Sequence, residues 1–178
     1  MISNCWNNTW SDWAHGFEAM KVQHFSKQSE ILAPPAEVFA WYEQPGAVER
    51  LTPPWERVEM VQRATGLHVG ARVIFKVYTG PFWRRWVAEH TDYEPLHLFA
   101  DVQRQGPFAY WHHRHRFEPT ARGTTLMTDE IDYALPLGWL GELFGGAFTR
   151  VKLQRMFDYR HQVVAQQFNP HAAGLKHA

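Results

Sequence analysis

The chain has 178 residues, of which 45% are hydrophobic, and its 18 basic and 18 acidic side chains give a formal net charge of zero. This length suits one globular domain with a substantial core. The even charge balance argues against a dedicated nucleic-acid binder, which carries a basic surface. No apolar run reaches the roughly 20 residues of a membrane span, and the N-terminus lacks the pattern of a secretory signal.

The ends of the chain differ from its middle. Residues 1–19 are polar, with spaced tryptophans and no periodicity, and they predict a poorly structured extension unless translation begins at Met20. We predict one domain over 20–170 and a tail over 171–178. The single cysteine, Cys5, excludes an intramolecular disulfide, which fits a cytoplasmic protein.

Turn signals and periodicity predict the elements of the domain in chain order. A strand over 21–32 ends at Ala33-Pro34-Pro35, and two short helices follow over 36–42 and 47–51. Turns rich in glycine and proline then separate further strands over 56–64, 71–79, 82–93, 96–103, 110–119 and 124–135. Because their connections are short, neighbouring strands must be antiparallel.

A long helix is predicted at the end of the domain, from Leu140 to Phe168. It is the only predicted element long enough to cover one face of a curved sheet. The predicted fold class is therefore α+β, with about seven antiparallel strands curved around a C-terminal helix. The content of 9 Trp, 12 Phe and 6 Tyr indicates either a core of large side chains or the aromatic wall of a ligand cavity.

Two neighbouring strands carry the candidate ligand-binding residues. Alternation along the first places Trp111, His113, His115 and Phe117 on one face, which we predict to line the cavity. The outward face of that strand holds its remaining histidine and its arginines. The next strand and the last helix complete the predicted set with Met127, Asp129, Ile131, Tyr133, Phe144 and Phe148.

An inward Asp129 requires a partner, because a buried unpaired charge is costly. His113, His115 or an arginine would serve, either as a structural ion pair or as a general acid and base. Asp101 could likewise form a structural ion pair or act as a general acid or base, although the sequence does not define which face of its strand points inward. A metal bound by His113 and His115 would need a third ligand, such as Asp129 or Glu130, and the spacing is not diagnostic. We expect no metal and no other cofactor.

No catalytic motif is recognisable. The chain has no nucleophile elbow, phosphate-binding glycine loop, paired-cysteine zinc pattern or dinucleotide fingerprint. Any enzyme built on this sequence would depend on the shape of a cavity and a few polar groups, so no catalytic residue is assigned.

Several local strings together resemble a known superfamily; they lie at 33–39, 51–55, 106–108, 111–117, 133–138 and 156–161. With the element order, they resemble the helix-grip fold of START-like and birch-pollen-allergen-like (SRPBCC) proteins. The match is to the bacterial branch of cyclase/dehydrase-type ligand-binding proteins. The resemblance implies a cavity for a small hydrophobic ligand, such as a lipid, isoprenoid or aromatic polyketide-like metabolite. A cyclase or dehydratase is one alternative. Because this branch also occurs joined to epimerase-like domains, a regulatory partner of an epimerase-like protein is another.

Overall fold

The computed structural model describes residues 21–169 of the chain. The predicted extension over 1–19 and the predicted tail over 171–178 lie outside the described residues. None of the described helices is both long enough and apolar enough to cross a membrane.

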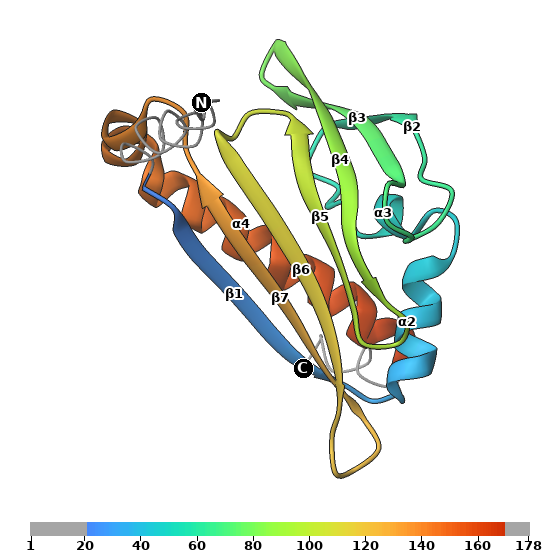
Figure 1. The fold of residues 1–178 in the computed structure, drawn as a ribbon. Coiled ribbons are helices and arrows are strands. Elements are labelled where there is room, and N and C mark those ends of the chain that lie inside the picture. Colours follow the sequence, from blue (N-terminus) through green and yellow to red (C-terminus); the bar gives the residue numbers. More distant parts are fainter. Residues whose placement is uncertain (1–20, 170–178) are drawn as a thin grey trace, which may run out of the picture.

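The described residues form one seven-stranded antiparallel sheet with three helices (Figure 1). The strand order is β1-β7-β6-β5-β4-β3-β2, so the first and last strands along the chain are neighbours. The strands are β1 (Gln23–Ile31), β2 (Val58–Gln62), β3 (Arg72–Thr79), β4 (Phe82–Glu94), β5 (Leu98–Gln105), β6 (Tyr110–Pro119) and β7 (Thr125–Ala134). The helices are α2 (Pro35–Glu43), α3 (Ala47–Arg50) and α4 (Gly138–Phe168).

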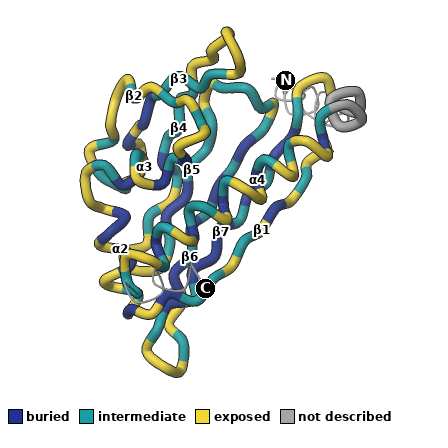
Figure 2. Tube along the Cα trace, turned by 180° about the vertical axis from the view of Figure 1, so that it is seen from behind, coloured by how far each residue is buried: buried dark blue, intermediate teal, exposed yellow. Residues whose placement is uncertain are grey.

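Helix α4 crosses one face of the sheet, as Figure 2 shows from behind. Its buried side chains Leu153, Phe157, His161 and Val164 recur every three or four residues and therefore share one stripe of the helix. The prediction of a curved antiparallel sheet around a long C-terminal helix is confirmed. The fold is the α+β helix-grip fold.

Two apolar clusters fill the space between the sheet and the helices. In the first, α2 and the end of α4 pack on the sheet through residues that include Phe39, Tyr42, Phe117 and Val164. The second lies under the middle of α4 and comprises Phe25, Trp111, Ile131, Tyr133, Leu153 and Phe157. Along β6 the side chains alternate between buried and partly exposed, which is the pattern of a strand with one covered face.

Candidate functional site

A group of polar side chains is buried between the two apolar clusters. His113 and His115 come from β6 and Asp129 from β7, and the register sets His115 directly opposite Asp129. His161 reaches the same point from α4. The exposed fractions of His113, Asp129 and His161 are 3%, 2% and 3%. With Asp101 of β5, described below, these residues form what we term the Asp129 cluster.

The Asp129 carboxylate is the centre of this cluster. It accepts hydrogen bonds from His113 Nε2 and His161 Nε2, each at 2.8 Å. His115 Nδ1 lies 2.7 Å from the oxygen that His113 contacts. The far nitrogen of His161, Nδ1, is 2.8 Å from the hydroxyl of Ser29 on β1. One carboxylate thus joins three histidine rings from two elements.

This arrangement determines which ring nitrogens carry protons. An ionised carboxylate only accepts hydrogen bonds. The nitrogens that face Asp129 therefore bear hydrogen, and His161 Nδ1 accepts from the Ser29 hydroxyl. In their neutral forms, His113 and His115 then present a lone pair on the opposite side of each ring, at Nδ1 and Nε2 respectively.

Asp101 lies on the side to which these two lone pairs point. It stands opposite His113 in the register of β5 and β6. Its Oδ2 is 3.6 Å from His113 Nδ1 and 3.9 Å from His115 Nε2. Among the described residues, none donates a hydrogen bond to Asp101 within 3.5 Å. Burial raises the pKa of the Asp101 carboxyl to about 6, although the charge of His115 opposes the shift.

The two carboxylates differ because their surroundings differ. Burial alone would raise the pKa of Asp129, but the charge of His115 and the hydrogen bonds from the three rings hold it well below its ordinary value. Burial also lowers the pKa of His113 to about 3, so this ring is neutral near pH 7. A carboxylate with a strongly lowered pKa beside one with a pKa of about 6 is an arrangement suited to proton transfer.

Two further side chains reach the cluster. The charge of Arg160 on α4 interacts with Asp129 and Asp101, while its Nε donates to the carbonyl oxygen of Leu51 at 3.3 Å. The ring of Tyr42 on α2 lies 5.7 Å from that of His115, and its hydroxyl is 3.3 Å from the sulfur of Met127.

The structure places the sequence-predicted residues in the polar cluster, in two apolar clusters and at the exposed surface. His113, His115 and Asp129 converge as described. Phe117 and Met127 belong to the apolar cluster under α2, and Trp111, Ile131 and Tyr133 to the one under α4. Phe148 is 72% exposed on α4. The side chain of Phe144 lies outside the part of the chain whose side chains are described.

Sequence reasoning missed His161, Arg160, Ser29 and Tyr42. His161 follows Phe157 by four residues, which places both on one face of a helix. This spacing predicts that His161 lies on the buried face of the helix, but it does not predict which strand residues that face contacts.

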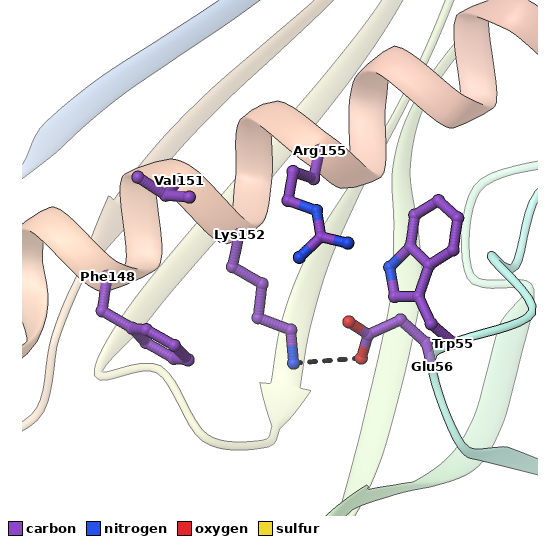
Figure 3. Close-up of a pocket in the computed structure, with 6 residues that line it drawn as sticks. All are labelled: Trp55, Glu56, Phe148, Val151, Lys152 and Arg155. Carbon is purple, nitrogen blue, oxygen red and sulfur yellow. Dashed lines mark ion pairs between the residues drawn. The ribbon is translucent and has the colours of Figure 1, made fainter.

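A groove opens between α4 and the segment that joins α3 to β2 (Figure 3). Its volume is about 200 Å³. Phe148, Val151, Lys152 and Arg155 line it from α4, and Trp55 and Glu56 line it from the joining segment. Lys152 Nζ is 3.0 Å from a Glu56 oxygen, and the Arg155 guanidinium lies 5.4 Å from the centroid of the Trp55 ring.

Acid is expected to destabilise the protein through His90, which lies on β4 beside the Asp129 cluster. Burial lowers the pKa of His90 to about 4. An unfolded histidine binds its proton near pH 6.5. Between these pH values the unfolded state carries the extra proton, so the free energy of unfolding falls as the pH falls. We expect a loss on the order of 2 kcal/mol by pH 4.

Urea denaturation midpoints measured from pH 7 to pH 4 test this expectation. The His90→Gln variant should lose less stability over that interval than the parent, and His97→Gln, at an exposed turn position, is the control. Equal losses in the parent and His90→Gln would show that His90 does not contribute.

The seven-stranded antiparallel sheet with α4 across one face defines a protein of the helix-grip class. The model of the family described as polyketide cyclase/dehydrase and lipid transport matches residues 31–158. The chain belongs to this family. No curated protein sequence matches the chain.

Several solved structures resemble this chain. A nucleoside-diphosphate sugar epimerase from Corynebacterium glutamicum is 28% identical with a TM-score of 0.61; the match covers 80% of this chain but only 28% of that protein. An aromatase/cyclase from a Streptomyces species is 15% identical with a TM-score of 0.65, over 85% of this chain and 96% of that one. A START superfamily protein from Mycobacterium smegmatis is 11% identical with a TM-score of 0.61, over 83% and 97%. The last two show the likeness of fold alone.

Proposed function

We propose that the protein binds a small, largely apolar ligand through the groove between α4 and the joining segment. The observation that carries this proposal is the apolar rim of the groove. Phe148, Val151 and Trp55 are 72%, 60% and 50% exposed around one concavity. Exposed apolar side chains around a hollow are typical of ligand sites, and the Lys152–Glu56 ion pair and Arg155, which lie between these residues, add polar groups to the groove.

Further aromatic rings pack together at the apolar cluster under α4, apart from the residues that line the groove. The Trp86 ring centroid is 5.2 Å from that of Trp111, 5.6 Å from Phe75 and 5.7 Å from Phe108. The exposed rings of Phe148 and Trp55, which do line the groove, favour an aromatic, isoprenoid or lipid-like ligand. The groove, at about 200 Å³, is below the roughly 300–1,000 Å³ of sites for drug-sized molecules. It therefore suits a smaller ligand or one end of a longer one.

Replacing Phe148 with serine is expected to weaken binding of an environment-sensitive apolar dye by roughly tenfold or more, since burial of a phenyl ring contributes about 1.5–3 kcal/mol. The melting temperature should not change, because Phe148 is 72% exposed. Fluorescence titration measures the first quantity and a thermal melt the second.

Phe82→Ser is the matched control, because Phe82 is 76% exposed on the β3–β4 hairpin, away from the groove. Equal dye affinity in both variants, or no dye binding by the parent, would contradict the proposal. Native mass spectrometry of freshly purified parent protein is a separate test, which would identify any small molecule that the protein retains.

A second candidate, a cyclase- or dehydratase-type enzyme, is favoured by the convergence of His113, His115 and Asp129 with Asp101. Ring closure and loss of water both require a proton to be removed at one atom and delivered at another. Neutral imidazoles oriented by an ionised carboxylate are suited to that task. A molecule recovered from the protein should then be converted by fresh parent protein, with a shift in chromatographic retention for ring closure and the loss of one water for dehydration, and should remain unchanged with His115→Gln. The absence of both changes with the parent would leave binding alone as the function.

Regulation of an epimerase-like protein is supported only by the likeness to 28% of the length of the epimerase from Corynebacterium glutamicum. Size-exclusion chromatography of this chain mixed with a purified nucleoside-diphosphate sugar epimerase tests it. Co-elution of the two proteins would favour this role, and separate elution would count against it.

A further inference from the structure

The Asp129 cluster has a side that hydrogen bonding between its members does not use. There, the lone pairs of His113 Nδ1 and His115 Nε2 and a carboxylate oxygen of Asp101 face one another. We propose that Asp101, His113 and His115 bind one divalent transition metal ion of the zinc class. This inference does not depend on the ligand proposed for the groove.

The distances between the three candidate ligand atoms suit such an ion. Asp101 Oδ2 is 3.6 Å from His113 Nδ1 and 3.9 Å from His115 Nε2, and all three atoms lie within 4.8 Å of one another. Bonds of about 2.0–2.1 Å in a tetrahedral site place neighbouring ligand atoms roughly 3.4 Å apart. Since the separations are 3.6 Å, 3.9 Å and at most 4.8 Å, movements of about 1 Å or less at each ligand atom, within the reach of side-chain rotation, would complete the geometry.

Asp129 contacts the ring nitrogens of His113 and His115 that would not bind the metal, which is the position of an outer-shell carboxylate in a metal site. Histidine ligands of metals usually donate their other ring N–H to a carboxylate or carbonyl, which orients the ring and holds its tautomer. His113 does so through Nε2 at 2.8 Å, and His115 Nδ1 lies at 2.7 Å from the same oxygen. The two rings are thus oriented before any metal arrives.

The charge of the site also favours a cation. A metal ion binds histidine only through a deprotonated ring nitrogen, so with His113 and His115 as ligands the two carboxylates of the cluster face the single guanidinium of Arg160. The side chain of Asp101 is 14% exposed and none of the described residues donates a hydrogen bond to it, which costs free energy when the carboxylate is ionised. A dication would provide the missing partner.

Three protein ligands leave a fourth position open on a tetrahedral ion. Sites of this kind hold a water molecule or a substrate oxygen there, whereas structural zinc sites are closed by four protein ligands. A polarised oxygen on such an ion would lie beside the neutral imidazoles of the cluster.

The experiment uses the full chain, stripped of metal with a chelator and then titrated with zinc by isothermal calorimetry. Cobalt(II) serves as a second, spectroscopic probe. We expect one ion per chain and visible cobalt bands of a four- or five-coordinate site. Because loss of an outer-shell partner costs about 10–100-fold in metal affinity, loss of a ligand should cost at least about 100-fold. Asp101→Asn and His115→Gln should both show this loss.

Two controls keep the proposal open to refutation. His112→Gln changes the neighbouring outward-facing residue of β6 and should bind zinc like the parent. Asp101→Asn replaces a carboxylate that lacks a donor, so its metal-free melting temperature should not fall, and its loss of zinc cannot be ascribed to unfolding. The chain has 11 histidines. Zinc binding that survives in Asp101→Asn would therefore belong to other histidines and would overturn the proposal, as would no zinc binding by the parent.

Discussion

Replacing Asp129 with asparagine is expected to lower the free energy of unfolding by about 3–5 kcal/mol, which for a chain of this size is a fall in melting temperature of roughly 6–20 °C. Asp129 is 2% exposed, and imidazole nitrogens approach both of its oxygens. An asparagine amide would offer one acceptor and would direct its own N–H groups at ring nitrogens that also carry hydrogen. Thermal and urea denaturation in the presence of a chelator measure the effect without any contribution from metal.

Asp132→Asn is the matched control for this prediction. Asp132 lies on the same strand and accepts a hydrogen bond from Arg114 at 2.8 Å, but its side chain is 26% exposed. Partly exposed ion pairs contribute little to stability, so we expect a change of no more than about 1 kcal/mol. If the two variants melted alike, the hydrogen bonds to Asp129 would not be a substantial part of the stability of the fold.

Replacing Phe117 with glutamine is expected to destabilise the protein by at least about 3 kcal/mol, because a large core side chain is lost and an amide is buried. Phe117 has no exposed surface. Its ring centroid lies 5.2 Å from that of Tyr42, 5.4 Å from Phe39 and 6.0 Å from Phe99. Circular dichroism melts of the parent and the variant measure the loss.

A graded second variant and a control make this result interpretable. Phe117→Leu keeps the site apolar and should cost about 1–2 kcal/mol. Phe82→Gln, at a position that is 76% exposed, should melt like the parent. A Phe117→Gln protein with the melting temperature of the parent would mean that water reaches this ring, and that the ligand cavity extends under α2.

Most of the fold could be predicted because its turns are marked locally. Proline and glycine separate the strands, and Pro35 begins α2 where a missing N–H has no cost. The largest boundary differences have local causes. The strand predicted from Leu96 begins at Leu98, because Leu96 adopts a positive φ of 70° in the preceding turn. The strand predicted over 56–64 covers only Val58–Gln62, since Trp55 and Glu56 face α4 across the groove.

The candidate site could be predicted only as far as alternation along a strand extends. Because alternate residues of a strand share one face, the sequence predicts that His113 and His115 lie on the same face of the sheet as Asp129. Asp101 could not be placed, because shifts in the register of β4 and β5 interrupt the pairing around His90. His161 depends on how α4 is rotated about its axis, and a helix whose apolar residues drift around it does not define that rotation.

The pairing of β1 with β7 has a consequence for the way the chain acquires this structure. Gln23 pairs with Tyr133 and Ile31 with Thr125, so about a hundred residues separate the partners. Contacts so distant along the chain close large loops and slow folding. During synthesis β1 is made before its partner β7. Until β7 has been made, the side chains of Phe25 and Ile31, which are buried in the folded protein, stay exposed to water. The Asp129 cluster also needs α4, so it can assemble only after nearly the whole domain has left the ribosome.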